Sequence, residues 1–360
     1  MNKNILDDKM SIIKLQGDKD VIISIYKLDQ QILASFNQAK KITFPKEYFI
    51  IENVVIGGMG GSRFPALIIK ELFKEEIKKP IIVNDNYQLP NFVNEKTLFI
   101  ASSYSGTTEE VLIMLKEAIN KKAKILGITA GGELAKKLSE LKVPFYQFNP
   151  IYNPSNQPRI GFGYAVGGLI GLFQAIKLLK INEKQFNGAI KFLGEIIKSF
   201  SIEASLKKNE AKKLAISLLE KYPYYIVSEF LTGVGNAIAN QTNETAKAIS
   251  DFRVIPELNH HLMEGLKHPE ILKKLLVFVF FESTLYSPPI QKRFLITKEV
   301  VEKNEVATIS YKLLGKTKIE QVFEMMALGS FVSMYLSVLY KENPTIIPYV
   351  DYFKKRLKEV

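Results

Sequence analysis

The stretch that decides the fold runs from residue 97 to residue 115 and reads Thr97-Leu98-Phe99-Ile100-Ala101-Ser102-Ser103-Tyr104-Ser105-Gly106-Thr107-Thr108-Glu109-Glu110-Val111-Leu112-Ile113-Met114-Leu115. Its apolar start predicts a buried strand, and its apolar end predicts the start of an amphipathic helix. The turn between them gathers hydroxyl groups and unpaired backbone amides at a helix N-terminus, a place that attracts anions. The stretch therefore predicts strand, turn and helix with a phosphate site. A capped helix, with Thr107 or Thr108 as N-cap, is the competing interpretation.

The same alternation of strand and helix extends outward from this stretch in both directions. Strands are expected at residues 53–56, 80–83, 98–101, 124–128 and 144–148, with helices at 66–73 and 109–120. A second series has strands at 224–227, 275–281 and 306–310 and a final helix at 319–340. Alternating elements of this kind predict an α/β fold with mainly parallel, doubly wound sheets flanked by helices. We expect an N-terminal segment over 1–35, a first domain over 36–190 and a second domain with C-terminal helices over 191–360.

Composition narrows the classes of function. The 360 residues include no cysteine, which excludes disulfides, thiolate metal sites and cysteine nucleophiles. Forty-nine Lys and Arg against 37 Asp and Glu give a net charge of +12, but the lysines are scattered and no nucleic-acid-binding motif accompanies them. We therefore expect no nucleic-acid partner. The N-terminus lacks an apolar signal segment, and the apolar stretch at 161–173 is too short to span a membrane, so a cytoplasmic protein is expected.

A glycine-rich turn follows the first predicted strand, as Gly57-Gly58-Met59-Gly60-Gly61-Ser62. A dinucleotide-binding turn would need a further glycine at Arg63, and a phosphate-binding P-loop would need Gly-Lys-Ser or Gly-Lys-Thr. The turn is open enough for a ligand to approach its backbone closely. Tight packing of strand against helix explains it equally well.

Polar residues in the second half of the chain supply candidate chemistry. His260, His261 and His268 lie within nine residues but do not have a familiar metal-ligand spacing, so no metal site is expected. A histidine here suits proton transfer better, because imidazole titrates near neutral pH. Residues 240–247 form a polar patch on an apolar helical stretch, which places it either at the surface or at a site. Arg159 precedes the most apolar helix and needs an anionic partner.

Together these motifs resemble the bifunctional phosphoglucose/phosphomannose isomerase family, which is built from two sugar isomerase (SIS) domains. The resemblance rests on five segments in order: Gly58-Met59-Gly60-Gly61-Ser62, Ser103-Tyr104-Ser105-Gly106-Thr107-Thr108-Glu109, Gln157-Pro158-Arg159, Asn243-Glu244-Thr245-Ala246-Lys247 and Pro256-Glu257-Leu258-Asn259-His260. Each segment is weak alone. Their order and the sixteen-residue separation of Glu244 and His260 make the match specific.

The resemblance implies an aldose–ketose isomerase that interconverts glucose 6-phosphate, and mannose 6-phosphate, with fructose 6-phosphate through a cis-enediol, without metal or cofactor. It implies that Glu244 moves the proton, that Arg159 stabilises the enediolate and that His260 opens the sugar ring. Lys354 would assist ring opening. The implied phosphate-binding residues are Ser103, Ser105, Thr108, Gly60, Gly61 and Ser62. In this family the histidine comes from the partner subunit, which implies a homodimer.

The chain departs from the family pattern at three positions. Arg63 follows the first glycine turn where the family has small residues, and it could reshape the sugar pocket. Thr107 and His261 each stand where asparagine is usual. Two other functions stay open: an isomerase for another phosphosugar, and a sugar-phosphate sensor without chemistry. A sensor would not need Glu244, Arg159 and His260 together.

Overall fold

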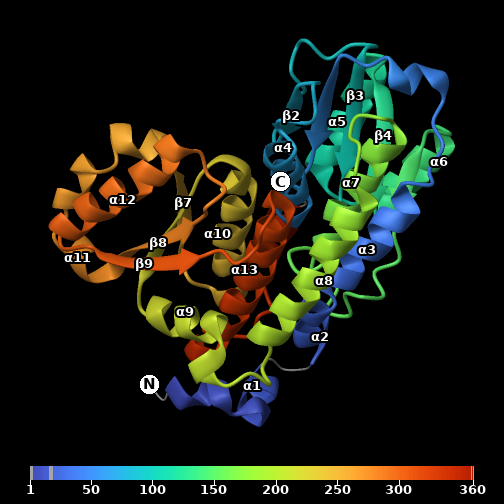
Figure 1. Cartoon of the computed structure of the whole chain (residues 1–360). Coiled ribbons are helices and arrows are strands. Elements are labelled where there is room, and N and C mark those ends of the chain that lie inside the picture. The colour runs from blue at the N-terminus through green and yellow to red at the C-terminus, as the bar shows by residue number, and fades with distance from the viewer. Residues whose placement is uncertain (1–2, 16–18, 358, 360) are drawn as a thin grey trace.

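The computed structural model describes residues 3–15, 19–357 and 359. Residues 1–2, 16–18, 358 and 360 lie outside this description, and so do the outer limits of the predicted N-terminal segment and second domain. The chain forms two parallel sheets, one on each side of a central group of helices (Figure 1). The two units meet along α13, which lies in the middle of the molecule (Figure 1). This arrangement confirms the predicted α/β class with two sheets.

The first sheet contains five parallel strands in the order β2-β1-β3-β4-β5. The strands are β1 (Asn53–Gly57), β2 (Ile81–Asn84), β3 (Thr97–Ser102), β4 (Lys124–Thr129) and β5 (Phe145–Gln147). Every residue of β3 is buried, as expected for a central parallel strand covered on both faces. Leu98 and Ile100 pack into the core shared with the other unit, whereas Phe99 and Ala101 face a separate cluster with side chains of α5 and α6.

Helices cover both faces of the first sheet, as in a doubly wound fold. They are α4 (Phe64–Leu72), α5 (Glu109–Asn120), α6 (Gly132–Glu140) and α7 (Gly163–Ala175). Before them lie α1 (Lys9–Leu15), α2 (Asp20–Tyr26) and α3 (Leu28–Ala39), and after them α8 (Glu183–Phe200). The predicted helices at 66–73 and 109–120 are therefore confirmed as α4 and α5. The domain limits at 35/36 and 190/191 stay predictions, and both fall inside helices, α3 and α8.

The apolar helix α7 packs closely against α3 through glycines spaced four residues apart. A Cβ at Gly167 would lie 2.1 Å from the carbonyl oxygen of Ile32, and one at Gly171 would lie 2.7 Å from that of Phe36. Only glycine allows the two backbones to approach so closely. Residues 163–173 are all buried, so this stretch is a core helix of the chain.

The second sheet contains four parallel strands in the order β7-β6-β8-β9. They are β6 (Tyr222–Val227), β7 (Asp251–Val254), β8 (Leu276–Glu282) and β9 (Ala307–Lys312). Strands β6, β8 and β9 match the predicted ones. Strand β7 was not predicted, because its sequence Asp251-Phe252-Arg253-Val254 has no apolar run and all four residues are only partly buried at the sheet edge.

The helices of the second unit are α9 (Glu210–Leu218), α10 (Thr232–Ala246), α11 (Leu272–Leu275), α12 (Pro288–Lys303), α13 (Lys318–Tyr340) and α14 (Pro348–Leu357). Short 3-10 turns lie at Lys3–Asp7, Lys46–Phe49, Gly60–Ser62, Leu206–Lys208, Glu229–Leu231, Glu257–His260 and Glu264–Lys267. Helix α13 is long and apolar enough to cross a membrane, but the apolar window is entirely buried within the fold. It is therefore the core helix around which the two units pack.

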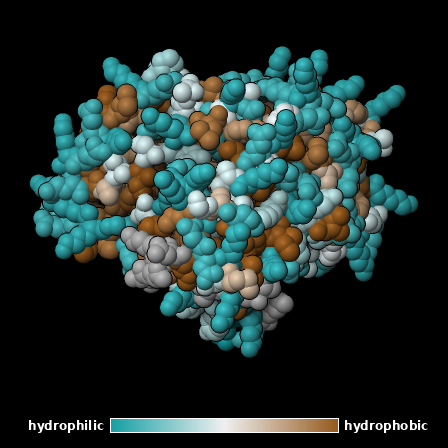
Figure 2. Space-filling view, turned by 60° about the horizontal axis from the view of Figure 1, so that its bottom comes forward, coloured by the Kyte–Doolittle hydropathy of each residue, from teal (hydrophilic) through white to brown (hydrophobic). Residues whose placement is uncertain are grey.

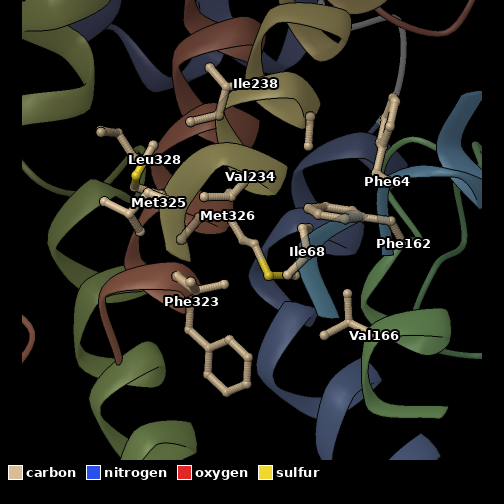
Figure 3. Close-up of a cluster of buried hydrophobic side chains, with 14 of the residues drawn as sticks. Phe64, Ile68, Phe162, Val166, Val234, Ile238, Phe323, Met325, Met326 and Leu328 are labelled. Carbon is tan, nitrogen blue, oxygen red and sulfur yellow. The ribbon is translucent and has the colours of Figure 1, made fainter. Parts of the chain in front are cut away.

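A continuous hydrophobic core joins the two units where α4, α7, α10 and α13 meet. Phe64 and Ile68 of α4 lie beside Phe162 and Val166, and opposite Val234 and Ile238 of α10 and Met326 of α13 (Figure 3). Helix α10 also approaches α4 through Gly233, where a Cβ would lie 2.4 Å from the carbonyl oxygen of Leu67. This junction fixes the N-terminal half of α10 relative to α4 and the start of α7.

The face of the molecule in Figure 2 is mostly hydrophilic, and hydrophobic residues lie in smaller patches between the hydrophilic side chains. Helix α14 carries exposed apolar side chains, because no residue of that helix is buried.

Candidate active site

The hydroxyl-rich turn after β3 forms a compact cluster at the N-terminus of α5. The hydroxyl oxygens of Ser103 and Thr108 lie 2.8 Å apart, and those of Ser105 and Thr107 lie 3.0 Å apart. Thr108 occupies the N-cap position, yet within the described residues its side chain makes no hydrogen bond to the first amides of the helix. The N-cap position was predicted correctly, but side-chain capping was not. The helix dipole and the hydroxyl cluster therefore share one anion-attracting point.

The glycine turn after β1 lies directly against this cluster. The Ser62 hydroxyl accepts a hydrogen bond from the Tyr104 amide at 2.8 Å, and the Ser102 hydroxyl donates to the Ser62 carbonyl at 3.0 Å. Gly60 is exposed at the turn and has a φ of +48°, which favours glycine. Because β1 and β3 are neighbours, the two turns meet at the carboxyl edge of the sheet, where parallel sheets bind ligands.

Gly61 brings the same turn into contact with the loop that carries Arg159. A Cβ at this position would lie 2.7 Å from the carbonyl carbon of Pro158 and 2.8 Å from the amide nitrogen of Arg159. Gly61 is therefore a position of tight packing against the loop before α7, and close approach of a ligand to this turn stays a prediction.

A chain of hydrogen bonds connects the hydroxyl cluster with Arg159. The Tyr104 hydroxyl accepts from the Asn153 side-chain amide at 2.8 Å, and that amide also donates to the Gln157 carbonyl at 3.1 Å. The Gln157 side-chain oxygen then accepts from Nη1 of Arg159 at 2.8 Å. The loop before α7 is thus held in one conformation between the two turns and the guanidinium.

Arg159 is 1% exposed, and all three of its guanidinium nitrogens have partners. Nη1 donates to Oε1 of Glu244 at 2.8 Å, and Nε donates to the Thr245 hydroxyl at 3.1 Å. Nη2 donates to the carbonyl oxygens of Pro344 and Thr345. Burial lowers the pKa of Arg159 while Glu244 opposes that shift, and an arginine remains cationic at neutral pH. The predicted anionic partner of Arg159 is therefore Glu244.

Glu244 lies in the last turn of α10, and its side chain is 30% exposed. One face of the carboxylate is held by a buried cation while the other reaches solvent. The polar patch around it lies partly inside the fold: Gln241, Thr242 and Thr245 are buried, whereas Asn243 is exposed. A hydrogen bond connects this patch with Arg159: the Gln241 side-chain amide donates to the Arg159 carbonyl at 2.8 Å.

Among the described residues, no hydrogen bond or ion pair joins the predicted site residues His260 and Lys354 to this group. His260 ends a 3-10 turn and is exposed. Lys354 lies on the exposed helix α14. His261 makes a 3.6 Å contact with Glu257. Across residues 3–15, 19–357 and 359, no group of three or more His, Asp or Glu side chains could hold a metal ion.

The Arg63 side chain is held by contacts with two other residues. Its Nε lies 2.8 Å from Oδ2 of Asp85, and Nη1 donates to the Asn236 side chain of α10 at 3.2 Å. The residue that departs from the family pattern therefore links the glycine turn to the second unit. The sequence did not predict these contacts of Arg63. It also did not predict the carbonyls of Pro344 and Thr345 as partners of Arg159, because every residue has a backbone carbonyl and the Asn343-Pro344 pair indicates only a turn.

Comparisons with known proteins show the family and the fold of the chain. Residues 207–357 match a family model described as the bacterial phospho-glucose isomerase C-terminal SIS domain. The chain is 33% identical over 339 residues to a bifunctional phosphoglucose/phosphomannose isomerase of Caldicellulosiruptor bescii, covering 94% of this chain and 98% of that protein. A protein with the same name from Aquifex aeolicus is 26% identical, with 90% and 96% coverage. In fold, the chain resembles a hypothetical protein from Thermus thermophilus, with a TM-score of 0.76, 16% identity and coverage of 98% and 94%.

Proposed function

Because the chain belongs to the bifunctional phosphoglucose/phosphomannose isomerase family, we propose that it interconverts glucose 6-phosphate and mannose 6-phosphate with fructose 6-phosphate. The observation that carries the proposal is the pairing of Glu244 with the buried Arg159, which hydrogen bonds through Gln157, Asn153 and Tyr104 connect to the hydroxyl-rich turn after β3. A carboxylate next to a preorganised cation is suited to forming and stabilising an enediolate.

In the proposed mechanism, Glu244 removes the proton from C2 of the open-chain aldose and returns it to C1. A proton also passes from the C2 hydroxyl to the C1 oxygen, so that C2 becomes the ketose carbonyl and C1 its hydroxymethyl group. The C2 carbon–hydrogen bond breaks, its electron pair forms the carbon–carbon double bond of the enediolate, and negative charge develops on the carbonyl oxygen. Arg159 stabilises that charge from a buried position, where solvent does not screen it. The carboxylate fits this task because it can hold the proton between the two carbons.

The phosphate of the sugar would bind at the turn after β3. Ser103, Ser105 and Thr108 contribute hydroxyl groups there, and the backbone of Gly60 and Gly61 together with Ser62 borders the same point. The network through Tyr104, Asn153 and Gln157 sets the separation between this phosphate position and Glu244.

A homodimer would complete the site, with His260 of one chain opening the sugar ring in the other. His260 is exposed, and among the described residues it makes no hydrogen bond or ion pair with Glu244, which supports a role across an interface. Helix α14 also supports a second copy as partner, because Tyr349, Tyr352 and Phe353 are 87%, 65% and 60% exposed on a helix with no buried residue. Lys354 on the same helix would assist ring opening. A cytoplasmic location fits the absence of cysteine.

The test is formation of fructose 6-phosphate by the purified chain from glucose 6-phosphate and, separately, from mannose 6-phosphate, both in EDTA. Turnover of both sugars is expected, since no step of the proposed mechanism uses a metal. Turnover of glucose 6-phosphate alone would overturn the mannose activity. Binding without turnover of either sugar would overturn the isomerase and favour the sensor.

A further inference from the structure

A second cation, Lys247, lies close to the proposed base but has no part in the proton transfer. It follows α10 directly, in the left-handed conformation with a φ of +55°. Its Nζ donates to the carbonyl oxygen of Asn343 at 2.6 Å and to that of Thr245 at 3.3 Å. Lys247 therefore connects the end of α10 with the loop between α13 and α14.

That loop, residues 343–345, also holds Arg159. Nη2 of Arg159 donates to the carbonyl oxygens of Pro344 and Thr345, the two residues after the one that Lys247 holds. The Asn343 side chain closes the loop on itself, accepting from the Thr345 amide at 2.8 Å and from the Thr345 hydroxyl at 2.7 Å. Three consecutive carbonyls are thus directed at two cations.

The position of the Arg159 guanidinium depends on this loop. Gln157, Glu244 and Thr245 bind its Nη1 and Nε, but among the described residues only the loop binds its Nη2. If the loop moved, Nη2 would lose both acceptors inside a buried site, and the guanidinium would tilt to find others. Even a shift of about 1 Å at a catalytic group can lower a rate about 100-fold.

We propose that Lys247 is a positioning residue of the isomerase site, which holds the 343–345 loop so that its carbonyls fix Arg159 against Glu244. This assignment rests on the proposed function. It also links the site to α14, because the same loop leads into that helix.

The charge of Lys247 provides a second readout. Burial and the nearby Arg159 lower the pKa of Lys247 to about 8, while Glu342 and Glu244 oppose the shift. Above that pH the amine becomes neutral, and its hydrogen bond to Asn343 loses the contribution of the charge. Turnover should therefore fall as the pH rises through about 8.

The experiment compares Lys247→Met and Lys247→Arg with Lys341→Met in the full chain. Lys341 is a matched control, because it also follows a helix in the left-handed conformation, with a φ of +59°, but is exposed. Lys247→Met should lower kcat about 10-fold or more with little change in KM, in keeping with a displaced catalytic group. Lys247→Arg should restore kcat to within about 3-fold and retain it above about pH 8, because guanidinium does not titrate there. Lys341→Met should match the wild type.

Wild-type turnover is measured first, and its absence refutes the proposed function together with this assignment. With an active wild type, a Lys247→Met enzyme of normal kcat refutes the assignment alone. The same holds if Lys247→Arg fails to restore kcat while both variants unfold at the wild-type temperature. The assignment is also wrong if kcat falls above about pH 8 in Lys247→Arg as it does in the wild type.

Discussion

Replacing Glu244 by glutamine separates the chemistry of the site from its architecture. Glutamine has nearly the same shape as glutamate and keeps an acceptor oxygen for Nη1 of Arg159, now 2.8 Å from Oε1 of Glu244. It cannot take up a proton as a carboxylate does. The substitution therefore removes the proposed base and leaves the hydrogen-bonded frame around Arg159.

The expected effects on rate and on stability differ in size. A positioned general base contributes about 10²- to 10⁴-fold, so kcat should fall about 1000-fold, which corresponds to about 4 kcal/mol of transition-state stabilisation. The folded state should lose about 1 to 2 kcal/mol, because the glutamine oxygen still accepts from Nη1 but the buried Arg159 loses its anionic partner. A change of that size lowers the midpoint of thermal unfolding by about 1 to 3 °C in a chain of this length.

The assay measures fructose 6-phosphate formation for kcat, calorimetry for sugar-phosphate binding and thermal unfolding for stability. Glu117→Gln is the matched control, because the Glu117 side chain is also 30% exposed and pairs with Lys121 at the C-terminal end of α5, the end opposite the hydroxyl cluster. That control should keep the wild-type kcat. Isomerase activity within about 10-fold of the wild type in Glu244→Gln would exclude Glu244 as the base.

Three further predictions concern the frame of the site and the packing that supports it. Gly61→Ala should destabilise the chain by about 1–3 kcal/mol in denaturant unfolding, because its Cβ would lie 2.7 Å from the backbone of the loop before α7; Gly188→Ala, at an exposed position of α8 with no atom within 4 Å, should instead stabilise it by about 0.5–1 kcal/mol. Ser103→Ala should raise KM for the sugar phosphate more than it lowers kcat, and an unchanged KM in steady-state assays would remove this hydroxyl from the phosphate site. Lys212→Met should lower the midpoint of thermal unfolding, because Lys212 is fully buried and its loss leaves the carbonyls of residues 202 and 204 without its hydrogen bonds. Asp7→Asn removes the ion-pair partner of Lys212 and should have a smaller effect, because the Asp7 side chain is 46% exposed.

Much of the fold followed from local patterns in the chain. The apolar run of β3 and its Ser-Gly-Thr turn predicted strand, turn and helix, and α5 begins at Glu109 as expected, because strand burial and helix periodicity follow from local sequence. Helix α13 was predicted from its length and apolar composition. Strand β7 was missed, because an edge strand with partly exposed side chains has no apolar run.

Residue types and their order along the chain were enough to establish which chemical groups the site can use. They indicated that Arg159 needs an anionic partner and that Glu244 belongs to a polar patch that lies either at the surface or at a site. Tertiary packing determines which of these groups meet: Arg159 pairs with Glu244 from 85 residues away, and Arg159 also depends on carbonyls of the 343–345 loop. Backbone carbonyls are the same in every residue, so the sequence does not mark them. Only the packing of α10 against α4 and α13 brings them to the guanidinium.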